Sequence, residues 1–158
     1  MDSNVFISAK NAHYGMDFAP GFWDWLAAAH AAGVVYSVEA VRDELKVGAD
    51  ELATWVKKQP PSFFLAVDQT ALDELRKLAA WVKGQSQYTG GAVATFLASA
   101  DYFLVGQAKA LGFTLVTHEM PAPDAKSRVR IPEACIGLGV SYSLPWRMLR
   151  NEGARFIQ

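Results

Sequence analysis

The sequence predicts an α/β domain in which helices cover a central, mostly parallel sheet of about four or five strands. Short apolar strand candidates alternate with longer helical patterns, which is typical of parallel sheets with crossover helices. The chain has 158 residues, of which 51% are apolar and 20% charged, enough to bury the core of one globular domain. We therefore expect a single domain over residues 1–158.

In the first half of the chain, start and stop signals separate the elements. Pro20 and Gly33 bracket the helix formers of "PGFWDWLAAAHAA", because proline suits the first turn of a helix and glycine suits its end. The β-branched and aromatic residues of "VVYS" predict a strand, and Ser37 can cap a helix through "VEAVRDELK". A helix in "ADELATWVKK" and a strand in "SFFLAV" follow.

The second half continues this alternation. Asp68 can cap a helix in "LDELRKLAAWVKG", whose leucines keep helical spacing. "GGAVATFLASA" and "ADYFLVGQAKALG" predict two more helices, the second ending at Gly112. "FTLVT" predicts a buried strand and "RVRI" another. Pro132 opens a short helix, and "LPWRMLRNEG" predicts the last one.

Composition excludes several classes of protein. A net charge of -1 gives no global basic field that would attract nucleic acid. The single cysteine, Cys135, excludes an intrachain disulfide and a multi-cysteine zinc site, and we expect it to be a small buried residue. No basic segment followed by an apolar run opens the chain, and no apolar run approaches the roughly 20 residues of a spanning helix. We expect a cytoplasmic protein with no membrane partner.

Two acids stand at element ends that face the same edge of the predicted sheet. Asp101 opens a helix of about 16 Å, at about 1.5 Å per residue, and the strand after Gly112 returns roughly 15 Å towards Glu119. Asp2 and Glu44 hold comparable places. Each acid either caps an element or contributes to a functional site. Carboxylates that converge raise each other's pKa, and Mg²⁺ or Mn²⁺, which prefers oxygen ligands, relieves that repulsion.

Four segments, "DSNVFI", "VRDEL", "ADYFLVGQAKALG" and "LVTHE", resemble in order the signature segments of the PIN-domain family. The resemblance covers nearly the whole chain and is closest to stand-alone, VapC-like toxin ribonucleases with an "FWDWL" helix. It implies a three-layer α/β/α, Rossmann-like fold. It also implies a Mg²⁺- or Mn²⁺-dependent endoribonuclease that hydrolyses RNA phosphodiesters with metal-activated water, an antitoxin protein as partner, and a homodimer.

Carried over one by one, the resemblance assigns metal binding and catalysis to Asp2, Glu44, Asp101 and Glu119. Glu119 stands where many members have aspartate. Glu39 and Asp43 are poorer candidates on other faces of the helix that carries Glu44.

Two hydroxyl residues, Ser3 and Thr117, match positions that orient the carboxylates. Members of the family have an apolar strand before the first acid, and here only Met1 precedes Asp2. We therefore expect Asp2, next to the terminus, to be the least firmly held ligand.

Other residues are candidates for contacts with RNA or a partner. Lys126, Arg128 and Arg130 alternate along a strand-like stretch, so they share one face and either contact RNA phosphates or form a solvated face. His118 either touches a phosphate or is a solvated loop residue. The aromatic helix "GFWDWL" is a candidate surface for a second copy or an antitoxin.

Two further interpretations stay open at this point. The chain could be a catalytically silent PIN-like module that binds RNA or protein. It could also be an unrelated α/β phosphatase, although "DSNVF" is a poor version of an aspartyl nucleophile motif.

Overall fold

The computed structural model describes residues 1–156 and is mostly helical, with 60% helix and 5% strand. The predicted central sheet of four or five strands is therefore wrong. The strands of the described chain form two separate parallel pairs, β1 (Ser37–Val38) with β2 (Phe64–Leu65), and β3 (Leu115–Val116) with β4 (Tyr142–Ser143). β1 and β3 do not pair with each other. Met1 and Asp2 lie between them and bond to the two sides, Met1 next to β1 and Asp2 to β3.

Helices account for most of the remaining chain. The α-helices are α1 (Ser3–Ser8), α2 (Pro20–Ala31), α3 (Glu39–Lys46), α4 (Glu51–Lys58), α5 (Gln69–Gly84), α6 (Gly90–Leu97), α7 (Ala100–Leu111), α8 (Ile131–Leu138) and α9 (Pro145–Asn151). Two short helices of other types are also present, the π-helix η1 (Ala9–His13) and the 3₁₀-helix η2 (Pro61–Phe63).

The predicted helix boundaries are largely confirmed, because strong local signals mark them. Pro20 is the first residue of α2. The Asp68 carboxylate accepts a hydrogen bond from the Ala71 N–H at 2.8 Å and so caps α5. Gly112, at φ 68°, ends α7 in the left-handed conformation that glycine tolerates.

Two local predictions are wrong. Ser37 does not cap α3, since it lies in β1 and its hydroxyl donates to the Met1 carbonyl at 2.7 Å, while Val38 holds the N-cap position. "RVRI" forms no strand: Arg128 to Arg130 are irregular, and Ile131 opens α8. The Glu119 carboxylate accepts hydrogen bonds from Arg128 and from the Ile131 N–H, which holds this segment in a loop.

The start of the chain connects the two strand pairs. The Met1 amine donates to the Tyr36 carbonyl at 2.9 Å, just before β1. The Asp2 N–H donates in the opposite direction, to the Val116 carbonyl of β3 at 3.0 Å. These two residues therefore bond to their neighbours as a strand between β1 and β3 would, and α1 begins directly after them.

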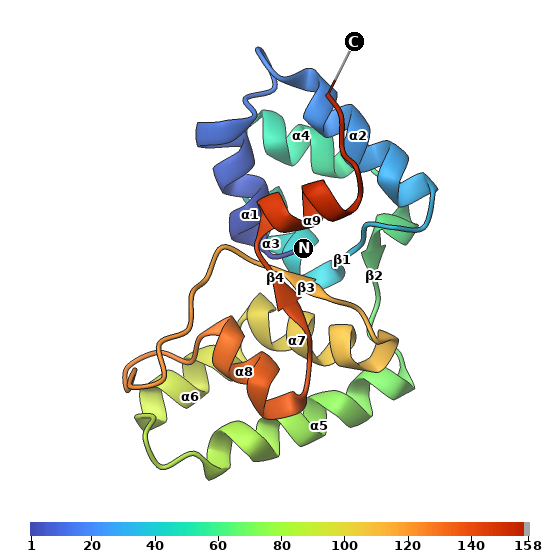
Figure 1. Ribbon diagram of the computed structural model, residues 1–158. Coiled ribbons are helices and arrows are strands. Elements are labelled where there is room, and N and C mark those ends of the chain that lie inside the picture. The colour runs from blue at the N-terminus through green and yellow to red at the C-terminus, as the bar shows by residue number, and fades with distance from the viewer. Residues whose placement is uncertain (157–158) are drawn as a thin grey trace.

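Two groups of helices flank the strands (Figure 1). In that view α1, α2, α4 and α9 lie above the strands, and α5, α6, α7 and α8 lie below. One core runs through both groups, with Phe6, Leu26, Phe63, Leu78 and Leu115 among its fully buried side chains. None of the helices in residues 1–156 combines the length and the apolar character that crossing a bilayer needs.

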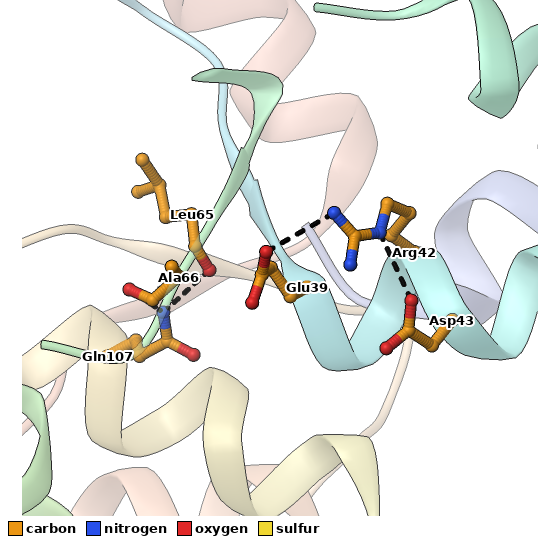
Figure 2. A network of polar contacts seen from close by, with 6 residues as sticks. All are labelled: Glu39, Arg42, Asp43, Leu65, Ala66 and Gln107. Atoms are coloured by element: carbon orange, nitrogen blue, oxygen red, sulfur yellow. Dashed lines mark hydrogen bonds and ion pairs between the residues drawn. The ribbon is translucent and has the colours of Figure 1, made fainter. Parts of the chain in front are cut away.

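The packing of α7 against α5 positions the start of α7, where Asp101 lies. A Cβ at Gly106 would stand 2.5 Å from Cδ2 of Leu75, so only glycine allows this approach without a shift. One turn earlier, the Tyr102 hydroxyl donates to the Leu75 carbonyl at 2.7 Å. Gln107 ties the other side of α7 to the end of β2, donating to the carbonyls of Leu65 at 2.9 Å and Ala66 at 3.2 Å (Figure 2).

Candidate carboxylate site

Asp2 is a buried carboxylate at the start of α1, only 1% exposed. One of its oxygens accepts from the Asn4 N–H at 3.4 Å and caps α1, and the other accepts from the Thr117 hydroxyl at 3.0 Å. Burial raises the pKa of the Asp2 carboxyl, and these hydrogen bonds oppose the rise. The structure thus holds Asp2 more firmly than its place beside the terminus suggests.

Glu44 comes from α3, on the side of that helix that faces the start of α1. The Ser3 hydroxyl donates to its Oε2 at 2.5 Å. This bond spans 41 residues of sequence and fixes the direction of a side chain whose residue is otherwise exposed. Ser3 and Thr117 therefore each donate a hydrogen bond to one of the predicted ligand carboxylates.

Glu119 follows β3 by way of Thr117 and His118. Its N–H donates to the Thr117 hydroxyl at 3.1 Å, so one threonine side chain contacts both Asp2 and Glu119. The Glu119 side chain is only 9% exposed, and its carboxylate pairs with the Arg128 guanidinium. Its second oxygen accepts from the Ile131 N–H at 2.8 Å, at the start of α8.

Asp101 stands in the first turn of α7, and the other three acids act on it electrostatically. Burial raises the pKa of Asp101 to about 7, and the negative charges of Asp2, Glu119 and Glu44 add to the rise in that order. Arg128 opposes it. The other three predicted acids thus lie near enough to Asp101 for their charges to act on its carboxyl. We call Asp2, Glu44, Asp101 and Glu119 the carboxylate cluster.

Glu39 and Asp43, the two poorer candidates on α3, bond to Arg42. Arg42 bonds to Glu39 at 3.3 Å and to Asp43 at 3.1 Å, on the surface of that helix (Figure 2). The side chains of Glu39 and Asp43 are 44% and 66% exposed. Glu44 is the acid of α3 whose charge is among those that raise the pKa of Asp101.

The three predicted RNA-contact residues do not share one strand face. Arg128, whose side chain is 54% exposed, pairs with Glu119 at the rim of the cluster. Arg130 points inward in part, because its Nε is buried and has no hydrogen-bond partner in the described part of the chain. Lys126 is anchored by its backbone, whose carbonyl accepts from the Thr89 N–H at 3.0 Å.

Sequence reasoning missed the pairing of His118 with His13. Their ring centroids lie 6.0 Å apart, and both line a cavity of about 140 Å³ between α1, α2 and α9. Burial lowers the pKa of His118, and so does the neighbouring His13. No local pattern indicates this pair, since His13 ends the π-helical turn η1, which the sequence does not predict. Cys135 is buried as expected, and burial raises the pKa of its thiol to about 12.

The donor atoms of the carboxylate cluster are of the kind that a hard divalent cation prefers. All four predicted ligands are carboxylates, and Mg²⁺ and Mn²⁺ prefer carboxylate oxygens. Burial is the main cause of the raised pKa of Asp101, and the negative charges of the other three acids, which a cation would offset, add to it. Within residues 1–156, no group of three or more histidine, cysteine or acidic side chains has the spacing of a metal site.

The chain belongs to the family described as domain of unknown function DUF4411, whose model matches residues 1–156. No curated protein and no solved structure matches it significantly.

Proposed function

We propose that this protein is a metal-dependent endoribonuclease of the PIN type, which hydrolyses RNA phosphodiesters. The observation that carries the proposal is the Asp101 carboxyl, whose pKa is raised to about 7 by burial and then by the charges of Asp2, Glu119 and Glu44. Perturbed carboxylates that converge from separate elements are typical of functional sites. The order of the four PIN-like segments, from which these acids come, supplies the reaction type.

In this proposal Asp2, Glu44, Asp101 and Glu119 hold Mg²⁺ or Mn²⁺. The bound cation would lower the pKa of a water molecule and offset charge on the phosphate. Ser3 and Thr117 fix the directions of Glu44 and Asp2 through their hydroxyl groups.

Arg128 is a candidate for binding an RNA phosphate beside Glu119, because its side chain is half exposed while it contacts that acid. Arg130 and Lys126 extend the same loop and are further candidates for phosphate contacts.

The proposal includes the biological setting that the resemblance implies. The protein acts in the cytoplasm as the toxin of a toxin–antitoxin pair, with an antitoxin or a second copy as partner. The "GFWDWL" helix offers less surface to a partner than its sequence suggests, since Phe22 and Trp23 are 2% and 3% exposed. Exposed apolar residues on other elements, such as Phe18 at 68% and Ile136 at 67%, are better candidates for such contacts.

A second candidate function is a catalytically silent module that binds RNA or protein. It is favoured by the existing partners of Glu119, whose two oxygens are engaged by Arg128 and by the Ile131 N–H. In that case Asp2 and Glu119 serve the fold, as a helix cap and a loop anchor. The two candidates differ in one property, which is whether RNA is cut.

Cleavage of a fluorescent single-stranded RNA tests the proposal. We expect cleavage by the wild type with Mg²⁺ or Mn²⁺, none with EDTA, and a loss of about a hundredfold or more in Asp101→Asn, which removes a ligand charge but keeps the shape.

The matched control is Asp43→Asn, an exposed acid on α3 that pairs with Arg42, and it should cut at the wild-type rate. If wild type and Asp101→Asn cut equally fast, the activity comes from a contaminant. If the wild type binds RNA without cutting it, the silent module is the better account.

A further inference from the structure

The cavity that His13 and His118 line lies next to the carboxylate cluster. It has a volume of about 140 Å³ and opens between α1, α2 and α9 (Figure 1). His118 stands in the chain between Thr117, whose hydroxyl donates to Asp2, and Glu119. The charge of Asp2 also acts on the pKa of His118. A molecule bound at the cluster would therefore meet this cavity at once. We call it the histidine pocket.

The inner walls of the histidine pocket are part of the core. Val5 and Ala9 of α1, Phe22 of α2 and Leu149 of α9 line it, and all four are buried. Met1 lines it too, but the Met1 amine donates to the Tyr36 carbonyl, and Tyr36 is not part of the lining. The walls thus come from buried side chains on three helices of the folded framework.

Three ring side chains mark the mouth of the pocket. His13, His118 and Trp146 line it and are exposed, Trp146 at 47%. The ring centroids of the two histidines lie 6.0 Å apart. Each imidazole has two nitrogens for hydrogen bonds, and Trp146 offers an aromatic surface. An occupant would therefore meet apolar walls inside the pocket and hydrogen-bonding rings at its mouth.

The volume of the histidine pocket limits what enters it. In other proteins a cavity of about 150 Å³ holds one benzene ring. At about 140 Å³, the pocket is therefore matched to one six-membered ring, and a second fused ring would protrude from it. Among the bases of RNA, a pyrimidine has a single six-membered ring and a purine has two fused rings.

Two cations stand at the same mouth. The guanidinium carbons of Arg147 and Arg150 each lie 5.1 Å from the ring centroid of Trp146. Both arginines are exposed, and neither forms an ion pair within residues 1–156. Guanidinium groups bind phosphate oxygens well, so a base in the pocket would have cations close to its flanking phosphates.

We propose that the histidine pocket binds one pyrimidine base of a single-stranded RNA whose backbone passes the carboxylate cluster. This inference rests on the proposed function, because the cluster is what makes RNA the expected occupant of a neighbouring pocket. Sequence-specific recognition of RNA mostly targets unstacked bases, which stack on aromatic side chains and bond through their edges. Trp146 provides the stacking surface, and His13 and His118 provide groups for the base edge.

Binding of two short RNAs in EDTA tests the proposal without cleavage. The probes are a fluorescently labelled RNA of six uridines and one of six adenosines, measured by fluorescence anisotropy. They carry the same number of phosphates, so the electrostatic part of binding is the same for both. We expect the wild type to bind the uridine RNA at least about tenfold more tightly, since only its bases fit the pocket.

Two exposed positions of the mouth show whether the pocket is where the base binds. Trp146→Ala and His13→Ala should each weaken binding of the uridine RNA by about tenfold and remove most of the preference, because they delete base contacts. Arg150→Gln should instead weaken both RNAs equally, since a phosphate contact does not read the base. The control Phe113→Ala removes an exposed aromatic ring that is not in the lining, and it should bind like the wild type.

The outcomes separate this proposal from the proposed nuclease activity. If the wild type binds both RNAs equally or binds neither, or if Trp146→Ala and His13→Ala keep the preference, the pyrimidine site is wrong, whether or not the protein cuts RNA. If the preference is present and both variants lose it, but no RNA is cut with Mg²⁺ or Mn²⁺, the base site stands and the nuclease proposal fails.

Discussion

The Thr117 hydroxyl donates to the Asp2 carboxylate at 3.0 Å, across 115 residues of sequence. This bond joins the residue after β3 to the cap of α1, and Thr117 is fully buried. The same hydroxyl accepts from the Glu119 N–H. One side chain thus contacts the carboxylate of Asp2 and the backbone of Glu119.

Replacing Thr117 by valine should therefore destabilise the fold. Valine keeps the shape but leaves a buried Asp2 oxygen and the Glu119 N–H without their partner, which costs about 1–3 kcal/mol. Urea unfolding measures the change. The control Thr95→Val, at an exposed position of α6, should change the free energy of unfolding by less than about 0.5 kcal/mol. Equal effects of the two variants would contradict the role given to Thr117.

Asp101 should make stability fall with pH in the absence of metal. Its folded pKa of about 7 lies above its ordinary value of 3.8, so the folded state binds the proton more tightly than the unfolded state. The resulting stabilisation is present below pH about 4 and is lost as the pH rises through about 7. Each pKa unit corresponds to about 1.4 kcal/mol, and partial exposure reduces the total to roughly 2–4 kcal/mol.

Urea unfolding in EDTA at several pH values checks this dependence against Asp101→Asn, which cannot titrate. The variant should be the more stable protein at pH 8 and should lack this part of the slope. Mn²⁺ should flatten the slope of the wild type, because a cation favours the charged carboxylates. If the wild type and the variant have parallel pH profiles, the folded-state pKa of Asp101 is not raised.

Arg128→Gln should weaken RNA binding. The variant loses one phosphate-binding cation, so the slope of log K against log salt should fall by about 0.7 on single-stranded RNA. Fluorescence anisotropy at several salt concentrations measures it, with Arg76→Gln, an exposed arginine of α5 paired with Asp73, as the control. An unchanged slope would place the RNA away from Glu119 and its loop.

Gly106→Ala should destabilise the protein by about 1–3 kcal/mol, because the new Cβ would meet Cδ2 of Leu75 at 2.5 Å. Gly84→Ala, at the end of α5, meets nothing within 4 Å and should stabilise by roughly 0.5–1 kcal/mol through helix propensity. Thermal unfolding compares the two. A neutral Gly106→Ala would mean that α5 and α7 separate easily and do not fix Asp101.

Much of the helical framework could be predicted from the sequence, since its signals are local. Pro20, Asp68 and Gly112 each mark a helix end through their own backbone or side-chain chemistry. The sheet could not be predicted, because an apolar window such as "FTLVT" shows that a segment suits a strand but not how many of its residues find a partner. Only Leu115 and Val116 pair there.

The candidate site, too, could be predicted from the sequence only in part. Element lengths predict that Asp101 and Glu119 face the same edge, and their joint role in a site stays a prediction. The hydrogen bonds of Ser3 to Glu44 and of Thr117 to Asp2 come from the structure. The pairing of Arg128 with Glu119 could not be read from the sequence, because it depends on a loop that the alternation of charges made look like a strand.

Calorimetric titration with Mn²⁺ tests the central claim most directly, namely that the carboxylate cluster binds a divalent cation. We predict heat of binding for the wild type and for Asp43→Asn, and binding weaker by at least about tenfold for Asp101→Asn. Equal binding by all three proteins, or none by the wild type at millimolar Mn²⁺, would contradict the claim.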